Sequence, residues 1–369
     1  MATLLAIELL DELVFGAREA AWPLVRDDLS LSYTQIGLLL SVPNLVSLVV
    51  EPALGLASVT WRRRALVLGG GVCFALALGL AAGAPSFWIL LVAFSLLYPS
   101  SGAFVSLSQA ALMDLEPGRR EHNMARWTFA GGVGVVLGPV ALAGFVWVGL
   151  GWRELFAGFA VLAVALVLLL RRSPEPQVDD ERPRLRDALR ALRRREVFRW
   201  LVLLELSDLL LDVFLGFLAL YFVDEVGASS ATGGLAVAVW SGAGLAGAAA
   251  MIPLLRRVDG LRYLRASAAA AAVLFIGFLL APGVGIKLVL VAAIAVVNAG
   301  WYPVLKARLY DALDGGSGLV LTVGALFPLN TVLPLGIAAL AERWGLGVAL
   351  WPLLAAPLAL LLLVPRRSA

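Results

Sequence analysis

The sequence predicts an all-α integral membrane protein with twelve transmembrane helices in two pseudo-symmetric six-helix halves. Hydrophobic residues make up 61% of the 369 positions and charged residues only 15%, which is more apolar surface than a soluble core of this length can bury. Apolar stretches of about 20 residues, the length of helix that crosses a hydrocarbon core of ~30 Å, recur between short polar or Gly/Pro breaks. In addition, the pattern of acidic residues near the start of the chain recurs 197 residues later.

The apolar stretches give the expected helices in order. Runs of this length lack the alternation that the strands of a membrane barrel require. The first run carries acidic residues and has no basic flank before it, so we expect no cleavable signal peptide. The twelve expected helices cover approximately residues 3–25, 34–57, 64–83, 86–113, 125–149, 151–171, 197–223, 229–255, 262–281, 285–313, 317–341 and 345–364.

The repeat divides the chain into two halves. A gapless shift of 197 residues places Glu8 on Glu205 and Asp11 on Asp208. The segment between the halves is rich in proline and charge, and its later part has leucines at helical spacing among arginines. This pattern indicates either an amphipathic helix on the inner membrane face or a solvated cytoplasmic linker. The predicted N-terminal half, linker and C-terminal half are residues 1–171, 172–196 and 197–369.

Lysine and arginine are distributed unevenly over the expected loops. If the chain starts inside, 24 of the 29 basic residues fall on that side, Arg18 lies within the first helix, and the outer loops hold only Arg26, Arg153, Lys287 and Arg343. The positive-inside rule therefore places both termini in the cytoplasm. The same asymmetry accounts for the net charge of +3, so we expect no nucleic-acid partner. Arginine outnumbers lysine 27 to 2, which favours a bacterial source, and we expect a multi-pass protein of a bacterial cytoplasmic (inner) membrane.

The sequence offers few residues suited to metal binding or to catalysis. The chain has one cysteine, Cys73 in an apolar helix, and one histidine, His122 in a basic cytoplasmic loop. No internal disulfide can form, and without a His/Cys cluster we expect no metal site of that type and no cofactor. A hydrolase needs a nucleophile with a base in reach, and the sole histidine lies in a loop, so we expect no enzyme.

The first helix carries charges where a bilayer tolerates them least. At ~1.5 Å rise per residue, Glu8 lies roughly 8 Å from the cytoplasmic end, and Asp11 and Glu12 lie close to the midplane. A charge at the bilayer centre costs at least ~2.5–3.5 kcal/mol, so such residues are expected to face water or a partner. On a helical wheel one stripe contains Glu8, Glu12, Phe15 and Glu19, and the adjacent stripe contains Asp11 and Arg18.

The seventh helix has a similar acidic face, because Glu205, Asp208 and Asp212 follow i, i+3, i+7 spacing. These acids are candidates for proton coupling, and structural explanations remain open for some of them. Shallow carboxylates reach water, and Asp11 with Arg18 could form a structural pair. The residues for which solvation is the alternative are Glu8, Glu205 and Glu19. The candidate proton-coupling residues are Asp11, Glu12, Asp208, Asp212, Glu8 and Glu205.

Other polar side chains inside the expected helices are candidates for substrate binding, and each could equally make interhelical hydrogen bonds. Tyr98–Pro99 and Trp301–Tyr302–Pro303 occupy related places in the two halves and suggest matching bends. The candidate substrate-binding residues are Arg18, Asn44, Glu51, Tyr98, Gln109, Asn298, Trp301, Tyr302 and Asn330.

Two parallel six-helix halves that both start inside resemble the major facilitator superfamily of secondary transporters. The resemblance covers the whole chain. In the loop after the second helix, Gly55, Arg63 and Arg64 match that superfamily's loop motif, whereas Val59 stands at its aspartate and Arg62 at its second glycine. The resemblance assigns this loop to gating.

The fifth helix resembles the branch of drug/proton antiporters. Gly134, Gly138 and Pro139 match the core of a motif typical of that branch, but Leu142–Ala143 stands where a glycine pair usually follows. The fourth helix lacks the intramembrane arginine that many drug antiporters carry. The glycines also have a packing explanation, because small residues let helix backbones approach closely.

The resemblance implies a carrier whose two halves rock about a central site. It sets the acidic faces of the first and seventh helices towards each other across water, where at least one carboxylate should hold its proton near neutral pH. We therefore expect alternating access and proton-coupled export (antiport) of a small, cationic organic molecule. The expected partners are that substrate, protons and the lipid bilayer, and the resemblance favours a monomer.

Three alternatives stay open. The same carboxylates could bind a divalent cation, because clustered oxygens suit Mg²⁺, Mn²⁺ or Ca²⁺. The carrier could also take up its substrate by proton symport. From a different class, the chain could be a membrane-embedded enzyme that uses two carboxylates, or a sensor without transport.

Overall fold

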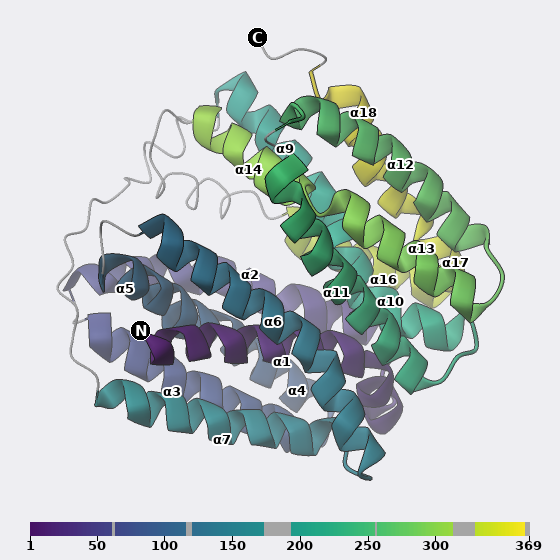
Figure 1. The fold of residues 1–369 in the computed structure, drawn as a ribbon. Helices are drawn as coiled ribbons and strands as arrows, with labels where there is room; N and C mark the ends of the chain where they lie inside the picture. Colours follow the sequence, from purple (N-terminus) through teal and green to yellow (C-terminus); the bar gives the residue numbers. More distant parts are fainter. Residues whose placement is uncertain (61–62, 116–119, 173–192, 255–256, 313–328, 366–369) are drawn as a thin grey trace. The chain divides into compact units, whose positions relative to one another are not determined.

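The computed structural model describes residues 1–60, 63–115, 120–172, 193–254, 257–312 and 329–365. All regular structure in these ranges is helical, which confirms the predicted all-α fold class. The chain forms two compact units, and we describe each by itself (Figure 1). Unit 1 comprises Met1–Asp180 with Ser230–Ala238, and unit 2 comprises Glu181–Ser229 with Val239–Ala369. Most of the expected linker at 172–196 lies outside the described residues.

Nine helical stretches of the described chain are long and apolar enough to cross a membrane. They coincide with nine of the twelve expected helices. Two of the other three are the carboxylate-bearing helices expected at 3–25 and 197–223, and both are helical throughout. The third, at 317–341, lies partly outside the described residues.

Unit 1 contains the first six expected helices. The fourth of them is interrupted by a π-helical segment, η1, and then continues as α5. The helices are α1 (Ala2–Leu29), α2 (Tyr33–Thr60), α3 (Arg63–Ala82), α4 (Phe87–Ser101), η1 (Gly102–Ser106), α5 (Leu107–Leu115), α6 (Arg120–Trp147) and α7 (Trp152–Arg171).

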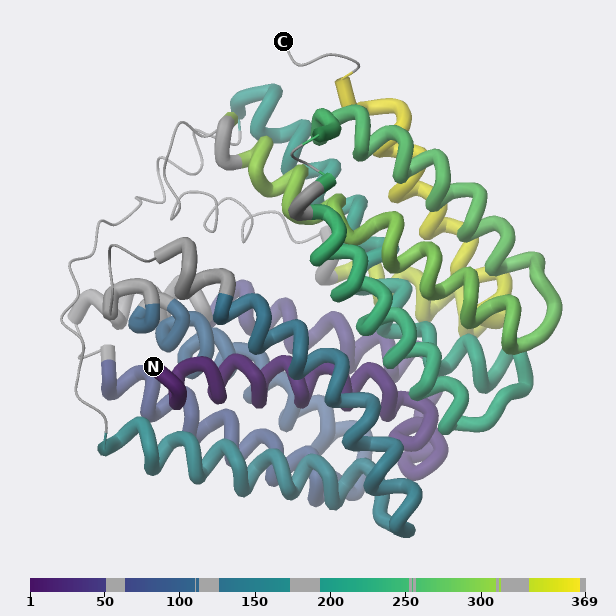
Figure 2. Tube along the Cα trace, in the orientation of Figure 1, coloured from purple at the N-terminus to yellow at the C-terminus, as the bar shows by residue number. Residues whose placement is uncertain are grey.

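The closest helix packing in unit 1 is between α1 and α6, which run side by side (Figure 2). Glycines on α6 make this approach possible. A Cβ atom on Gly134 would lie 2.6 Å from the Leu9 carbonyl oxygen, and one on Gly138 would lie 2.6 Å from the Leu13 carbonyl oxygen. Any larger residue would push the two backbones apart. The packing explanation of these glycines therefore holds in the structure.

A basic side chain fastens one end of unit 1. Arg153, at the start of α7, donates from Nε to Asp28 Oδ2 at 2.8 Å. Its Nη1 donates at 3.0 Å to the carbonyl oxygen of Ala82, the last residue of α3, and at 2.7 Å to that of Ala84, just after the helix. Trp152 Nε1 donates to the same Asp28 oxygen at 3.2 Å. The ends of α1, α3 and α7 are thus held together.

Unit 2 contains the remaining helices, and part of α11 groups with unit 1. The seventh expected helix is divided by a second π-helical segment, η3. The elements are α9 (Arg195–Asp208), η3 (Leu209–Val213), α10 (Phe214–Asp224), α11 (Ser230–Leu254), α12 (Gly260–Leu280), α13 (Val284–Asn298), α14 (Trp301–Ala312), α16 (Leu329–Trp344), α17 (Leu346–Ala349), the 3₁₀ helix η4 (Trp351–Leu354) and α18 (Ala355–Leu363).

Aromatic rings fill the middle of unit 2, where Phe214 makes edge contacts with Trp240, Phe275 and Phe278 at centroid distances of 5.3 Å. Beside them lies Lys287, in the first turn of α13, which is only 5% exposed. Its ammonium donates to Tyr221 Oη at 2.9 Å and to the carbonyl oxygen of Phe278. The sequence predicted an outer loop for this lysine, and the structure instead buries it because two ring faces and two oxygens receive its charge.

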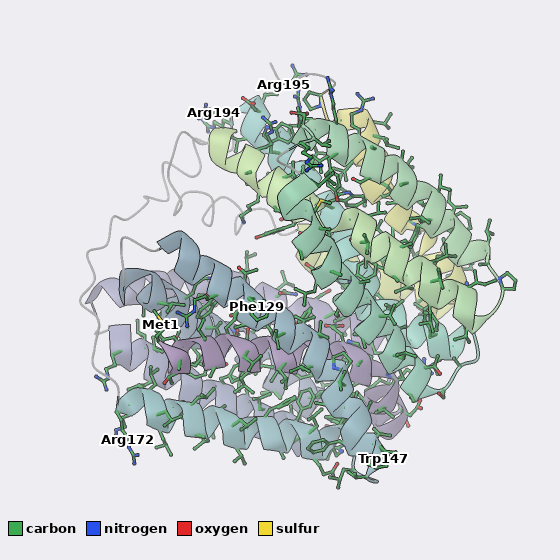
Figure 3. The ribbon with its side chains drawn as sticks, in the orientation of Figure 1. Met1, Phe129, Trp147, Arg172, Arg194 and Arg195 are labelled. Atoms are coloured by element: carbon green, nitrogen blue, oxygen red, sulfur yellow. The ribbon has the colours of Figure 1, made fainter. Side chains whose placement is uncertain are left out.

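Large apolar side chains remain exposed on both units, as the predicted bilayer requires. Trp147, at the end of α6, is 88% exposed (Figure 3). Leu76 on α3 and Leu362 on α18 are also exposed. Extended apolar exposure of this kind is unusual for a water-soluble protein and normal for surfaces that meet lipid tails.

Candidate functional site

Three carboxylates on α1 form the acidic part of the candidate site in unit 1. Glu8 is buried, and the negative charges of Glu12 and Asp11 both act on it. Its carboxylate is also hydrogen-bonded by the side chain of Trp127 on α6. Asp11 accepts a hydrogen bond of 2.8 Å from Ser101 Oγ, at the end of α4. Two further acids therefore act on Glu8, and Glu8 and Asp11 are each hydrogen-bonded from another helix.

The glycine face of α6 also makes room for these acids. A Cβ atom on Gly131 would lie 2.6 Å from Glu8 Oε1 and 3.3 Å from Glu12 Cγ. A side chain at position 131 would therefore displace Glu8. The sequence alone offered helix packing for these glycines, and the structure shows that Gly131 also leaves space for an acid.

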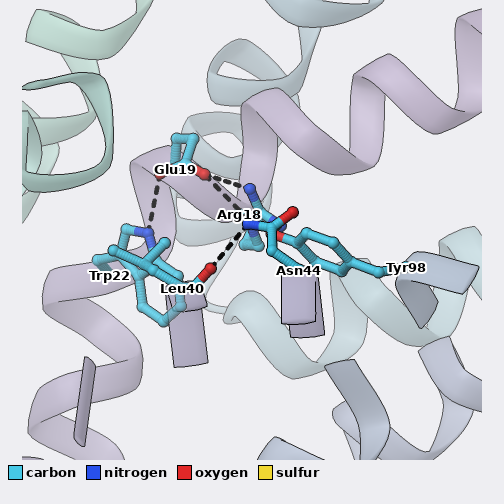
Figure 4. Close-up of polar contacts among 6 residues, drawn as sticks. All are labelled: Arg18, Glu19, Trp22, Leu40, Asn44 and Tyr98. Atoms are coloured by element: carbon cyan, nitrogen blue, oxygen red, sulfur yellow. Dashed lines mark hydrogen bonds and ion pairs between the residues drawn. The ribbon is translucent and has the colours of Figure 1, made fainter. Parts of the chain in front are cut away.

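A second cluster, formed by Arg18 and its partners, lies farther along α1 (Figure 4). Arg18 is 7% exposed and Glu19 is 2% exposed. Arg18 Nε donates to Glu19 Oε1 at 3.1 Å, Nη2 donates to the same oxygen, and Nη1 donates to the hydroxyl of Tyr98 on α4. The Arg18 guanidinium also lies over the rings of Phe15 and Tyr98, at 5.0 and 5.2 Å from their centroids. Trp22 Nε1 holds the other Glu19 oxygen at 2.9 Å.

This cluster revises two of the sequence-based explanations. Arg18 makes its ion pair with Glu19 rather than with Asp11, although its charge also acts on Asp11. Solvation explains neither Glu8 nor Glu19, because the structure buries both side chains among other helices. A buried carboxylate is stable only with partners, and these two have them.

The remaining candidates of unit 1 have mainly local contacts. Asn44 Nδ2 donates to the Leu40 carbonyl of its own helix at 2.9 Å (Figure 4), and Gln109 is partly buried. Arg64 Nη2 donates to the Arg171 carbonyl at 2.5 Å, where it stabilises the C-terminal end of α7. Three further candidates are at positions whose side-chain surroundings the structure does not describe, namely Glu51, Gly55 and Arg63.

In unit 2, the acids lie at a change of helix type. Glu205 and Asp208 on α9 are buried, and η3 begins directly after Asp208. Asp212, inside η3, is exposed. The π-helical turns alter the register after Asp208. The predicted single face of three acids is therefore wrong for Asp212, because that prediction assumed an uninterrupted α-helix.

The substrate candidates of unit 2 surround the break between α13 and α14. Tyr263 Oη accepts from the Gly300 N–H at 3.1 Å and donates to the Val297 carbonyl at 2.7 Å, which satisfies backbone groups that the break frees. Trp301 Nε1 donates to Ser267 Oγ at 2.9 Å. Trp301 therefore has a packing role, whereas the neighbouring Tyr302 is exposed. The side chain of Asn330 lies outside the described residues.

Asn298, the last residue of α13, differs from these neighbours. It is 2% exposed, and its Nδ2 has no hydrogen-bond partner among the described residues. The same shift of 197 residues that aligns the first and seventh helices takes Ser101 to Asn298. Ser101 is the residue that donates to Asp11 in unit 1. Asn298 therefore stays a candidate for a polar ligand.

Sequence reasoning missed three of the residues that shape the site. Trp127 and Ser101 contact Glu8 and Asp11, and Phe15 contacts Arg18. Ser101 gave a signal as a polar residue in an apolar helix, and Phe15 gave one because it shares a stripe of the first helix with Glu12 and Glu19. Within the described ranges, no group of three or more His, Cys, Asp or Glu side chains is arranged to hold a metal ion.

Comparisons with known proteins identify the family. The family model described as "Major Facilitator Superfamily" matches residues 13–305. No curated protein matches the chain significantly in sequence. Nothing in these comparisons points to the drug/proton antiporter branch, which therefore stays a proposal.

Solved structures similar to this chain cover almost its whole length. One is the nucleoside transporter NupG, with a TM-score of 0.78 and 13% identity over 98% of this chain and 96% of that chain. The D-xylose-proton symporter has a TM-score of 0.75 and 15% identity over 98% of each chain. A bacterial homolog of the human lysosomal transporter Spinster, inward-facing and occupied, has a TM-score of 0.75 and 14% identity over 98% of this chain and 92% of that chain. At these identities the structures show the fold, and the family model shows that this chain belongs to the Major Facilitator Superfamily.

Proposed function

We propose that this protein is a secondary active transporter that exports a small organic cation in exchange for protons by alternating access. One observation carries the coupling part of the proposal. Glu8, Asp11 and Glu12 lie within two turns of one helix, α1, and the charges of Glu12 and Asp11 both act on Glu8. Three ionised carboxylates at such separations repel strongly where water is scarce, so binding a proton relieves the repulsion.

Protonation of this group gives the conformational cycle its direction. A ligand shifts an equilibrium between two conformations only if it binds one of them more tightly. A proton taken up from the outside on Asp11 and released inside would bias the outward- and inward-facing states in this way. Ser101 assists because its hydroxyl accommodates either form of Asp11, donating to the carboxylate or accepting from the acid.

The charge balance of α1 supports a cationic substrate. Between Glu8 and Glu19 this helix carries four acids and one base, Arg18, which forms an ion pair with Glu19. A cavity wall with this excess attracts cations and repels anions. The proposed setting is a bacterial inner membrane, with both termini in the cytoplasm, and the proposed functional unit is a monomer.

Proton-coupled uptake is the second candidate. One similar structure is that of a D-xylose-proton symporter, a name that means substrate and proton move in the same direction. Divalent-cation transport has less support, because the described part of the chain offers no group of three or more ligating side chains.

The test is proton movement in proteoliposomes under an imposed pH gradient, with organic cations, neutral sugars and nucleosides, and divalent metals offered separately. We expect an organic cation to drive proton flux opposite to its own movement, and Asp11→Asn to abolish that flux. Asp27→Asn is the matched control, because the Asp27 side chain is 65% exposed beyond the charged part of α1. Flux in the same direction as the substrate would establish symport, and a response to metals alone would overturn the proposal.

A further inference from the structure

The guanidinium of Arg18 is held in the way that a protein holds a bound organic cation. We define the Arg18 cage as the side chains that contact this guanidinium: Phe15, Glu19 and Tyr98. We infer that the Arg18 cage is a cation-binding site that Arg18 itself fills when no substrate is present. A substrate with a guanidinium or ammonium group replaces Arg18 there. This inference rests on the proposed function, since it identifies the substrate's binding site.

Each part of the cage suits an organic cation. Glu19 supplies the counter-charge, and Trp22 fixes its carboxylate by donating to Oε2 at 2.9 Å. The rings of Phe15 and Tyr98 lie 5.0 and 5.2 Å from the charged carbon of Arg18, within the range in which aromatic faces attract cations. Phe15 and Tyr98 are both partly exposed, whereas Arg18 and Glu19 are buried.

Arg18 has a second partner available once it leaves the cage. Asp11 lies seven residues earlier on α1, about 10 Å along the helix axis. Long side chains on a helix point back towards its N-terminus, which is the direction of Asp11. The charge of Arg18 already acts on Asp11 in the present arrangement. A displaced Arg18 therefore moves closer to Asp11 and favours its ionised form.

This movement couples binding of the cation to loss of a proton. When a cation enters the cage, Arg18 pairs with Asp11, and the Asp11 carboxyl releases its proton to water as its charge becomes compensated. When a proton returns to Asp11, Arg18 loses that partner and re-enters the cage, which expels the cation. The two ligands exclude each other, and mutual exclusion is what antiport requires.

The internal repeat shows that the corresponding helix of unit 2 folds without a buried ion pair. In unit 2, the positions that correspond to Arg18, Glu19 and Trp22 are occupied by Leu215, Gly216 and Ala219. The helix at those positions is fully buried and folds without any charge. Burying an ion pair is no better for stability than packing apolar residues of similar volume. A role in ligand binding explains why unit 1 contains the pair.

The experiment measures binding of methylguanidinium to the purified full-length protein in detergent, with no gradient and no transport step. In Arg18→Ala the cage is empty, and we expect saturable binding about tenfold tighter than in the parent, or tighter still. Adding Glu19→Gln to Arg18→Ala should abolish the gain. Asp27→Asn, the exposed control, should bind as the parent does. Equal binding by the parent, Arg18→Ala and the double variant would overturn the inference.

A second variant covers the case in which Arg18→Ala does not fold because Glu19 is left unpaired. Arg18→Lys keeps a positive charge beside Glu19 but donates fewer hydrogen bonds and stacks less well on the rings. We expect it to fold and to bind methylguanidinium more tightly than the parent. Binding no tighter than the parent in this variant would also overturn the inference.

The role of Asp11 has its own readout. Asp11→Asn should weaken methylguanidinium binding when Arg18 is present, because the displaced Arg18 then lacks a charged partner. The same substitution should leave binding unchanged in the Arg18→Ala background. An equal effect in both backgrounds would contradict the exchange. Proton-coupled transport without cage binding would refute only the cage, whereas cage binding without proton flux would refute only the proposed function.

Discussion

Helix α1 of unit 1 and the helix formed by α9, η3 and α10 of unit 2 begin alike and then diverge. Both carry an acid pair at the same positions of the repeat, Glu8 with Asp11 and Glu205 with Asp208. The first helix remains regular and places Asp11 against Ser101. The second changes to π-helical turns directly after Asp208. Both units therefore share the acid pair, but the structure around the pair differs between them.

Farther along, the two helices differ in charge. Unit 1 buries Arg18 and Glu19 against aromatic side chains, whereas unit 2 has Leu215 and Gly216 at these positions. If the Arg18 cage binds the cation as we infer, recognition belongs to unit 1, and unit 2 shares with it the acid pair of the repeat.

Glu19→Gln should lower the free energy of unfolding by about 3–5 kcal/mol, because it leaves the buried Arg18 charge without its counter-ion. The double change Arg18→Leu with Glu19→Gly introduces the residues that unit 2 has at these positions. The double change should lower the free energy of unfolding by less than the single change does, since no charge is left unpaired. Unfolding in mixed micelles measures both. A single variant as stable as the parent would show that the pair is not buried in solution.

Gly134→Leu should destabilise the protein by about 1–3 kcal/mol or prevent folding, because the new side chain would enter the α1 backbone. Two leucine substitutions serve as controls, Gly144→Leu on the same helix and Gly336→Leu on α16 of unit 2. A Cβ atom at either of these positions meets nothing within 4 Å. Thermal unfolding should separate Gly134→Leu from both, and three equal transitions would refute the close approach of α1 and α6.

Lys287→Met tests the buried end of unit 2. Methionine keeps the length of the side chain but removes the hydrogen bonds to Tyr221 and to the Phe278 carbonyl. We expect a loss of about 1–3 kcal/mol, which is the usual result of leaving buried polar groups unsatisfied. Arg262→Met, at the start of α12, is the control with an exposed side chain. Equal stability of the two variants would indicate that Lys287 reaches water.

Asp28→Asn tests the corresponding end of unit 1. The Asp28 side chain is 43% exposed in its bridge to Arg153, and exposed bridges contribute only about 0.2–1 kcal/mol. The loss should therefore be smaller than for Lys287→Met and should decrease further at high salt. An effect as large as that of Lys287→Met would mean that this bridge is more important to unit 1 than its exposure implies.

The sequence predicted the helices and the repeat because both are patterns along the chain. Apolar length defines a membrane helix, and the spacing of Glu8 and Asp11 recurs without a gap. It also identified Asp11 and Arg18 as candidates, since a charge in an apolar helix is costly. The sequence did not identify the residues that contact these charged side chains. Trp127 and Ser101 contact the acids only because particular helices cross.

Local departures from the α-helix explain the other differences. The acidic face expected for Glu205, Asp208 and Asp212 assumed 3.6 residues per turn, and η3 does not keep that period. Lys287 was counted among the basic residues of the outer loops because it lies at the outer end of the helix expected at 285–313. Only the fold brings Tyr221 and Phe278 to its ammonium group.

Proton release on ligand binding shows whether the cation and the proton exclude each other. Methylguanidinium is titrated into weakly buffered protein with a pH-sensitive dye and without a membrane gradient. The parent should release about one proton per protein at saturation, because Arg18 then compensates the charge of Asp11. Asp11→Asn should release none, and Asp208→Asn should still release it, because unit 2 has Leu215 at the position of Arg18. Equal proton release by the parent and Asp11→Asn would contradict the account.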